Sequence, residues 1–239
     1  APAAPPGVTP DTKRGEEVRF VGPGGQLIGA WAAPTAGPAK AAVLVIHENQ
    51  GLTEHFFSVV GRLAAAGYGA LCVDLLSSKG GTAALTDKAQ APTVLADTPV
   101  DALVADLRAG IDELGRRVPG GKVGAVGFCF GGGLTWQLLQ AGEARLAAAV
   151  PFYGPAPDRP DFHRAKAAVL AIYGALDTRV DATRDRVEAA LKAAGLTYQV
   201  RTFDGANHAF FNDTGPRYNA GAAEQAYAAL LDWYRHYLA

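Results

Sequence analysis

Short apolar runs alternate with amphipathic stretches along most of the chain, which predicts an α/β fold. Six runs have strand length, and several of them are continuously apolar, as expected for parallel strands covered on both faces; they are residues 42–46, 70–74, 122–127, 146–152, 167–173 and 197–203. Helical stretches are expected at residues 55–66, 100–114, 181–194 and 220–238. This alternation predicts a mostly parallel central sheet with right-handed crossovers and helices on both faces.

The N-terminal part of the chain follows a different pattern. Segments 17–21 and 26–32 flank the turn-rich sequence Gly-Pro-Gly-Gly, which predicts an antiparallel hairpin. The first ten residues contain four prolines and show no apolar periodicity. We therefore expect an extended tail over residues 1–14 and a single domain over residues 15–239. The chain starts at alanine and contains no methionine, which fits an exported protein whose signal peptide has been removed. The alternative is a cytoplasmic protein.

Composition narrows the class of protein. Hydrophobic residues make up 49% of the chain, and 22 Lys and Arg balance 23 Asp and Glu for a net charge of -1. This apolar content excludes a disordered chain, and the balanced charge gives no overall basic field for nucleic acid or anionic lipid. No apolar run reaches the roughly 20 residues of a membrane-spanning helix. The sequence predicts a soluble protein with a small-molecule partner, and it leaves the oligomeric state open.

The segment 127–131, Gly-Phe-Cys-Phe-Gly, carries the candidate chemistry. It follows an apolar strand and precedes a helical stretch, in the pattern of the nucleophile elbow G-x-S-x-G with cysteine in place of serine. The residues two before and two after the nucleophile must be small because the backbones pass closely there. The following helix N-terminus is expected to favour the Cys129 thiolate, and the Phe130 amide is free to bind an oxyanion.

Cys129 also has two alternative interpretations. A free cysteine is often a buried apolar filler, and a glycine-rich loop can bind a dinucleotide, but neither G-x-G-x-x-G nor a P-loop Lys-Ser/Thr pair is present. Cys72 lies in an apolar run and is expected in the core. A disulfide between Cys72 and Cys129 stays open and would block the proposed chemistry.

A nucleophile of this kind needs a histidine base and a carboxylate that orients it, later in the chain and in the order acid, then histidine. Asp177 and His208 each follow a predicted strand, and ligand-binding groups gather at the carboxyl ends of strands in open α/β sheets. Asp204 is a rival acid. The alternatives are that Asp177 caps a helix and that His208 is merely exposed.

The remaining histidines give weaker signals. His47-Glu48 begins like the zinc-protease pattern H-E-x-x-H, but Gly51 stands where the second histidine is needed. We therefore predict no metal site there. His163 and His236 have no partner pattern and are expected at the surface.

Several segments together resemble the dienelactone hydrolase (carboxymethylenebutenolidase) family of α/β-hydrolases, from about residue 16 to the C-terminus. They are H-E-N-Q-G-L at 47–52, G-Y-x-A-L-C-V-D-L at 67–75, G-F-C-F-G-G-G at 127–133, V-P-F-Y-G at 150–154, the loop that holds Asp177, and G-A-N-H-A-F at 205–210. The resemblance implies an α/β-hydrolase fold and an ester- or lactone-cleaving enzyme. A cysteine elbow is fairly specific to this family, since most α/β-hydrolases have serine there.

The resemblance also implies roles for individual residues. Cys129, His208 and Asp177 would form the catalytic triad, and Glu48 would contact the resting cysteine and help it to ionise when substrate binds. The amides of Phe130 and Asn49 would hold the oxyanion. No metal or organic cofactor is implied. An apolar pocket for the substrate would be lined by Phe128, Tyr153 and Phe210, each of which could equally be a core residue.

The chain departs from the family where a substrate carboxylate would be held. Ala209 follows the histidine in place of a serine, Asn212 stands where an arginine is expected, and no arginine lies between Arg62 and Arg108. Lys79 or Lys88 could supply a charge, though without bidentate geometry. Dienelactone itself is therefore not favoured as the substrate. The alternatives are a thioesterase or broad carboxylesterase with the same triad, and a catalytically silent member that acts in binding or redox sensing.

Overall fold

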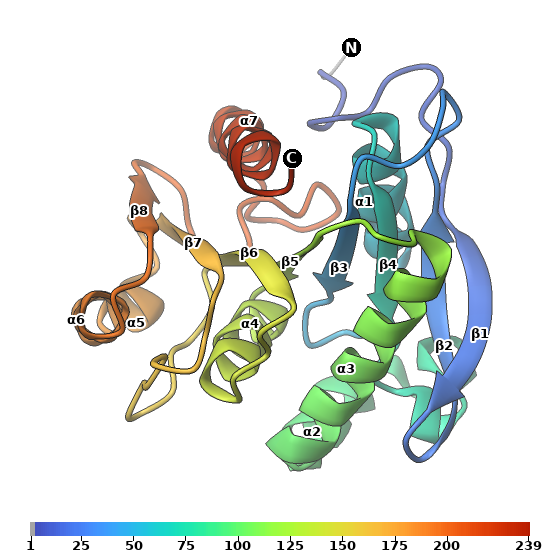
Figure 1. Cartoon of the computed structure of the whole chain (residues 1–239), viewed down its shortest axis with the longest axis horizontal. Coiled ribbons are helices and arrows are strands. Elements are labelled where there is room, and N and C mark those ends of the chain that lie inside the picture. Colours follow the sequence, from blue (N-terminus) through green and yellow to red (C-terminus); the bar gives the residue numbers. More distant parts are fainter. Residues whose placement is uncertain (1–2) are drawn as a thin grey trace.

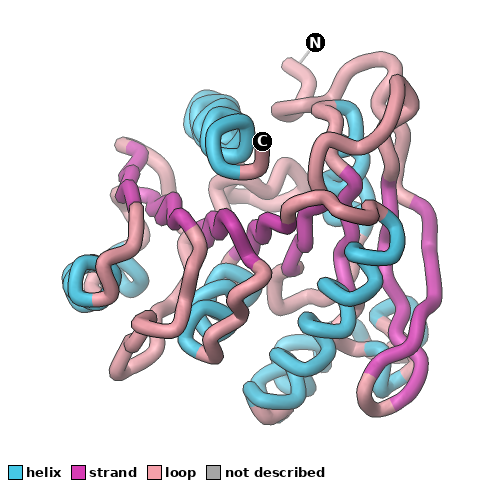
Figure 2. Tube along the Cα trace, in the orientation of Figure 1, coloured by secondary structure: helices cyan, strands magenta, loops and turns pink. Residues whose placement is uncertain are grey.

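An eight-stranded sheet runs through the computed structural model, which describes residues 3–239, with helices on both of its faces (Figures 1 and 2). The strand order is β1-β2-β4-β3-β5-β6-β7-β8, antiparallel from β1 through β2 to β4 and parallel elsewhere. The strands are β1 (Glu16–Gly22), β2 (Gly25–Ala32), β3 (Ala42–Ile46), β4 (Gly69–Val73), β5 (Val123–Phe128), β6 (Leu146–Phe152), β7 (Ala168–Gly174) and β8 (Tyr198–Phe203). The predicted hairpin and α/β sheet are confirmed.

Seven α-helices are present in the described residues: α1 (Glu54–Ala65), α2 (Ala91–Asp97), α3 (Val100–Arg117), α4 (Phe130–Gln140), α5 (Thr178–Asp181), α6 (Arg184–Ala193) and α7 (Ala220–Tyr237). Helices α1 and α7 pack on one face of the sheet, over one apolar cluster. Helices α3 and α4 pack on the other face, over a second cluster that also includes residues of α2, α5 and α6. The central strands are buried on both faces, which explains why they are apolar throughout.

One predicted helix is wrong in its extent. The stretch 181–194 is divided into α5 and α6, and α5 starts three residues earlier than predicted. The Asp177 side chain accepts a hydrogen bond from the Val180 amide and so caps the start of α5. The Thr183 hydroxyl then donates to the Val180 carbonyl where α5 ends. Helix α2 and three short 3₁₀ turns at residues 77–79, 82–84 and 88–90 were not predicted.

The N-terminal segment lies against α1 and α7 (Figure 1). The Gly15 amide donates to the Phe57 carbonyl at 2.8 Å, and a Cβ at Gly61 would lie 1.9 Å from the Lys13 carbonyl oxygen. Residues 1 and 2 of the predicted tail lie outside the described residues. No helix within residues 3–239 is long and apolar enough to cross a membrane.

A buried ion pair joins α1 to the loop after β8. The Arg62 guanidinium, 1% exposed, donates to Asp213 Oδ1 at 2.7 Å, and His55 Nδ1 lies 3.1 Å from the same oxygen. Burial raises the pKa of Asp213, but the hydrogen bonds from His55 and Arg62 together outweigh it and hold this pKa well below its usual value. The pair fixes the loop that also carries His208.

We expect Asp213→Asn to lower the free energy of unfolding by about 3 kcal/mol at pH 7, because it leaves the Arg62 charge buried without its partner. The folded pKa of Asp213 is depressed, so its contribution is full above the unfolded pKa of about 4 and is lost as the pH falls further. The difference in the free energy of unfolding between variant and wild type should therefore become smaller below pH 4. Urea unfolding at several pH values measures this difference.

Asp232→Asn is the matched control, since Asp232 pairs with Arg235 on the exposed face of α7, where both side chains are more than half exposed. Exposed pairs contribute little, so this variant should unfold nearly as wild type does. Equal losses in the two variants would contradict the assigned role of the buried pair.

Candidate active site

Cys129 lies on a sharp turn between β5 and α4. Its backbone has φ of 57° and ψ of -115°, a left-handed conformation that L residues other than glycine rarely adopt. Its amide donates to the Phe152 carbonyl at 3.0 Å, and its carbonyl accepts from the Gly133 amide at 3.0 Å. These bonds tie the strained residue to β6 and to the first turn of α4.

The glycines around Cys129 allow the backbones to pass. A Cβ at Gly127 would lie 2.0 Å from the Gly131 carbonyl oxygen, and a Cβ at Gly131 would lie 2.2 Å from the Ile46 carbonyl oxygen. Both distances are far below van der Waals contact, and the neighbours are backbone atoms that do not rotate away. The small residues of the G-x-C-x-G pattern are therefore required by sterics.

The structure brings together the three residues predicted as a triad. His208 Nε2 lies 2.9 Å from Cys129 Sγ, and His208 Nδ1 lies 2.5 Å from Asp177 Oδ2. Asp177 follows β7 and His208 follows β8, so both come from the carboxyl ends of strands. Asp177 also caps α5, so the two roles considered for it, helix capping and pairing with His208, are both observed. Asp204 is exposed, and it is Asp177 that contacts the imidazole.

The start of α4 favours the Cys129 thiolate, as expected, but does not make it the resting state. Burial, and next the negative charge of Glu48, raise the pKa of the Cys129 thiol to about 11. The Phe130 amide and the charges of Arg179 and Arg217 act in the opposite direction and are outweighed. Near neutral pH the sulfur is therefore a thiol beside an imidazole.

Glu48 lies in the loop after β3. Its Oε2 accepts a hydrogen bond from Asn212 Nδ2 at 2.9 Å, while the sulfur of Cys129 pairs with His208 instead. His47 fixes the backbone of this loop: its Nε2 accepts from the Leu75 amide at 3.0 Å, so Nδ1 donates to the Glu48 carbonyl at 2.7 Å. Burial lowers the pKa of the His47 imidazole. The ring is therefore neutral, as it must be to accept one hydrogen bond and donate the other.

One of the two predicted oxyanion donors, the Phe130 amide, acts on the sulfur. Phe130 is the first residue of α4, where its amide has no partner within the helix and faces the sulfur of Cys129. Asn49 is the residue after Glu48 in the loop that follows β3, the strand beside β5. Its side chain is partly exposed.

The three aromatic residues predicted to line a substrate pocket are almost completely buried: Phe128 is 1% exposed, and Tyr153 and Phe210 are 0% exposed. They belong to one aromatic cluster with Phe152. Tyr153 lies closest to the chemistry, with its ring centroid 5.2 Å from that of His208.

Backbone strain is concentrated at this site. Within residues 3–239, the residues other than glycine with positive φ are Cys129, Tyr153 at 37° and Ala209 at 62°. They adjoin or belong to the site from three different loops. Such strain persists only where the surroundings enforce it, and it is common where function constrains the backbone.

Sequence reasoning missed several partners of the site. In the sequence, Asn212 stands out only as a departure from the family. Its hydrogen bond to Glu48 joins two residues that are 164 positions apart in the chain. Arg179 and Arg217, which act on the thiol, carried no pattern in the sequence. Lys88, a candidate for binding a substrate anion, instead donates to the carbonyls of Thr82 and Ala83 at 2.8 and 2.9 Å.

Cys72, His163 and His236 lie where the sequence predicts them. Cys72 is buried in β4, and Cys72 and Cys129 are both free thiols. His163 and His236 are exposed. In the described part of the chain no three His, Cys, Asp or Glu side chains come together as metal ligands.

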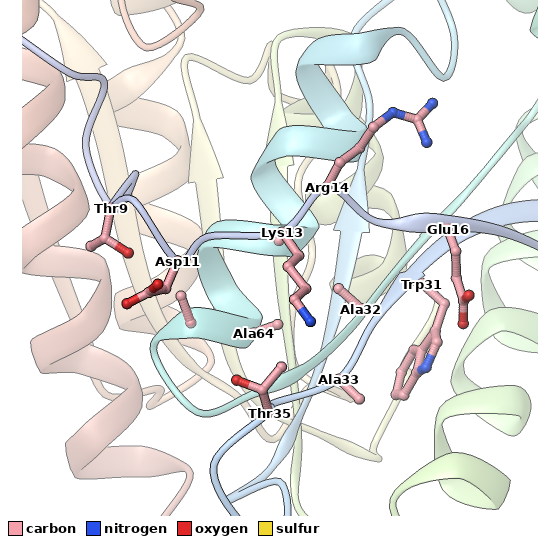
Figure 3. Close-up of a pocket in the computed structure, with 12 residues that line it drawn as sticks. Thr9, Asp11, Lys13, Arg14, Glu16, Trp31, Ala32, Ala33, Thr35 and Ala64 are labelled. Carbon is pink, nitrogen blue, oxygen red and sulfur yellow. The ribbon is translucent and has the colours of Figure 1, made fainter.

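A cavity of about 490 Å³ lies elsewhere, between residues 9–16, the end of β2 and α1 (Figure 3). Its lining includes Asp11, Lys13 and Thr35 beside several alanines, and it contains neither cysteine nor histidine. This cavity therefore holds no cysteine–histidine pair of the kind found at Cys129.

Comparison with known proteins shows the family of this chain. The model of the dienelactone hydrolase family matches residues 28–238. A protein of Methylorubrum extorquens named "Putative carboxymethylenebutenolidase" is 34% identical over 220 residues, covering 86% of this chain and 75% of that protein. A protein of the same name from Escherichia coli K12 is 31% identical, covering 82% and 76%.

Solved structures show the same fold. The crystal structure of a "Putative Dienelactone Hydrolase" from Klebsiella pneumoniae superposes with a TM-score of 0.83 at 26% identity, covering 93% of this chain and 98% of that one. A dienelactone hydrolase-like promiscuous phosphotriesterase from metagenomic libraries superposes with a TM-score of 0.78 at 27% identity, covering 94% and 98%.

Gly127→Ala should lower the free energy of unfolding by about 3 kcal/mol, because the added methyl overlaps the Gly131 carbonyl. Gly115→Ala is the control: Gly115 is exposed in α3 with nothing within 4 Å of its Cβ position, so alanine should raise stability by up to about 1 kcal/mol. Urea denaturation measures both. A stable Gly127→Ala protein would contradict the steric account.

Glu48→Gln should speed alkylation of Cys129 by iodoacetamide several-fold at pH 8. The carboxylate raises the pKa of the thiol, so removing its charge lowers that pKa and increases the thiolate fraction at a given pH. Mass spectrometry of the peptide that contains Cys129 follows the reaction. Asp204→Asn, which removes an exposed carboxylate, should leave the rate unchanged; an unchanged rate in Glu48→Gln would refute the electrostatic coupling.

Proposed function

We propose that this chain, which belongs to the dienelactone hydrolase family, cleaves a small ester or lactone through an acyl-enzyme intermediate on Cys129. The observation that carries the proposal is the continuous contact from Cys129 Sγ through His208 to Asp177, at 2.9 and 2.5 Å. That chain of contacts supplies a nucleophile, a base within reach of its proton, and a carboxylate that orients the base.

In this mechanism the reaction starts from a neutral thiol. His208 Nε2 accepts the proton of Cys129 as the sulfur attacks the carbonyl carbon, and Asp177 holds the imidazole with Nδ1 protonated and stabilises the imidazolium that forms. The imidazolium then protonates the leaving oxygen. Water, deprotonated by His208, attacks the thioester, releases the acid and restores the thiol. The enzyme returns to its starting state after each turnover, and the proposed reaction requires no cofactor.

The tetrahedral intermediate carries its charge on the former carbonyl oxygen. The amides of Phe130 and Asn49 are the proposed donors to it, one from the start of α4 and one from the loop after β3. A donor of this kind contributes about 3–4 kcal/mol to transition-state stabilisation in comparable enzymes. Both donors are backbone amides, so no side-chain torsion has to change for them to bind the oxyanion.

Three positions considered for holding a substrate carboxylate offer no free positive charge. Ala209 and Asn212 are uncharged, Asn212 is already bonded to Glu48, and Lys88 is bonded to backbone carbonyls. An anionic lactone would therefore depend on Arg179 and Arg217, whose charges act on the sulfur, for a bidentate partner. We infer that small esters and lactones are the substrates, and rates with an anionic lactone test whether these two arginines bind a carboxylate.

Hydrolysis of p-nitrophenyl acetate tests the proposal. Wild type should turn over, and Cys129→Ala, His208→Ala and alkylation by iodoacetamide should each reduce the rate to background. Cys72→Ala is the matched control, since this second cysteine is buried in β4 away from the histidine, and it should keep most of the activity. Full activity in Cys129→Ala would refute the assignment.

Substrate profiling separates the alternatives. Rates with uncharged lactones, simple esters and thioesters, each compared with an anionic lactone, rank the substrate classes. A protein that alkylates at Cys129 but turns over none of them would be the catalytically silent binding or redox member.

A further inference from the structure

Glu48, Cys129 and Tyr153 follow the ends of three neighbouring strands. Ile46 pairs with Gly127 between β3 and β5, and Phe128 pairs with Phe152 between β5 and β6. Cys129 and Tyr153 are the residues directly after β5 and β6, and Glu48 is the second residue after β3. The charge of Glu48 acts on both the Cys129 thiol and the Tyr153 phenol, so the three groups are close in space.

Two buried polar atoms at this place have no hydrogen-bond partner in the structure, Glu48 Oε1 and Tyr153 Oη. The other carboxylate oxygen of Glu48 is bonded to Asn212. The Phe211 amide is directed at the acceptor side of Tyr153 Oη without reaching hydrogen-bond geometry, so the proton of the hydroxyl remains to be donated. A buried polar group without a partner is destabilising, so an unpaired donor and an unpaired acceptor close to the same thiol point to a hydrogen bond between them.

The backbone at Tyr153 is strained. Tyr153 has φ of 37°, is 0% exposed and packs against His208 and Phe210. Burial, and next the charges of Glu48 and Cys129, hold the pKa of Tyr153 well above its usual value, so the hydroxyl stays protonated and remains a donor. A phenylalanine would fill the same space, so packing alone does not explain the hydroxyl.

We propose that Tyr153 is a positioning residue for Glu48: after adjustment of their side-chain torsions, its hydroxyl donates to Glu48 Oε1 and draws part of the carboxylate charge away from Cys129. Glu48 is thereby held by two neutral donors, Asn212 on Oε2 and Tyr153 on Oε1. The consequence is that the sulfur ionises more easily than it would beside an unshielded carboxylate.

Other charged groups also face the sulfur and must be kept constant in a test. His208, backed by Asp177, comes from the loop after β8, Arg179 from α5, and Arg217 from the loop before α7. Among these charges, Tyr153 changes only the effect of Glu48 on the sulfur, through a neutral hydrogen bond.

The test is the pH dependence of Cys129 alkylation by iodoacetamide in Tyr153→Phe. Loss of the donor leaves the full Glu48 charge acting on the thiol, so alkylation between pH 8 and 10 should slow several-fold and the profile should shift to higher pH. Ester hydrolysis should lose about tenfold in kcat with KM changed less than twofold. Thermal melting should show that the protein still folds.

Two further variants make the result specific. Tyr173→Phe removes the hydroxyl of another buried tyrosine whose Oη has no partner, on β7 and in the opposite core cluster, and it should leave the alkylation profile unchanged. In a Glu48→Gln background, Tyr153→Phe should have no further effect, because the charge it shields is gone.

An alkylation profile of Tyr153→Phe equal to that of wild type, with or without a lower melting temperature, would overturn the proposal. So would a slowing that persists in the Glu48→Gln background, since the hydroxyl would then act on the sulfur directly. The proposal rests on Cys129 as the proposed nucleophile, but alkylation needs no turnover. Absence of ester hydrolysis in wild type would therefore refute the proposed function and leave the role of Tyr153 to be decided by alkylation.

Discussion

The close passage of the backbone between β5 and α4 is the constraint on which the site depends. Cys129 can project from the sheet edge only because Gly127 and Gly131 leave room for carbonyl oxygens that would otherwise overlap a Cβ, at 2.0 and 2.2 Å. The strain at Cys129, with φ of 57°, is maintained by hydrogen bonds to β6 and to α4. Everything else at the site is arranged around a sulfur whose position this turn determines.

The electrostatics of that sulfur follow from competition between neighbours. Burial and Glu48 oppose ionisation, and they prevail over the helix N-terminus and two arginines. A thiol that stays protonated at rest is poorly reactive toward unwanted electrophiles, since the thiolate is the nucleophile. In the proposed mechanism it becomes reactive only when the imidazole beside it accepts the proton, and Asp177 keeps the imidazole ready to do so.

The sequence predicted the strands and the candidate triad because their signals are local. A continuous apolar run identifies a buried parallel strand, and the spacing of the glycines around Cys129 identifies the turn. The partners of Asp213 and Asn212 could not be predicted, because their contacts with Arg62 and Glu48 span 151 and 164 positions. The state of the thiol could not be predicted either, since a helix N-terminus is visible in a sequence while desolvation is not. The division between α5 and α6 depends on one threonine hydroxyl, which bonds to a carbonyl in the folded chain.

Asn212 connects the departures in sequence to the behaviour expected of the site. An arginine at this position would neutralise Glu48 and offer a charge to a substrate carboxylate, whereas an amide can only donate a neutral hydrogen bond. Glu48 therefore keeps a negative charge that bears on Cys129, in line with the raised pKa of the thiol. The charges of Arg179 and Arg217 oppose the effect of Glu48 on the sulfur and are outweighed together with the Phe130 amide. An amide in place of a guanidinium at position 212 thus leaves a thiol that is hard to ionise.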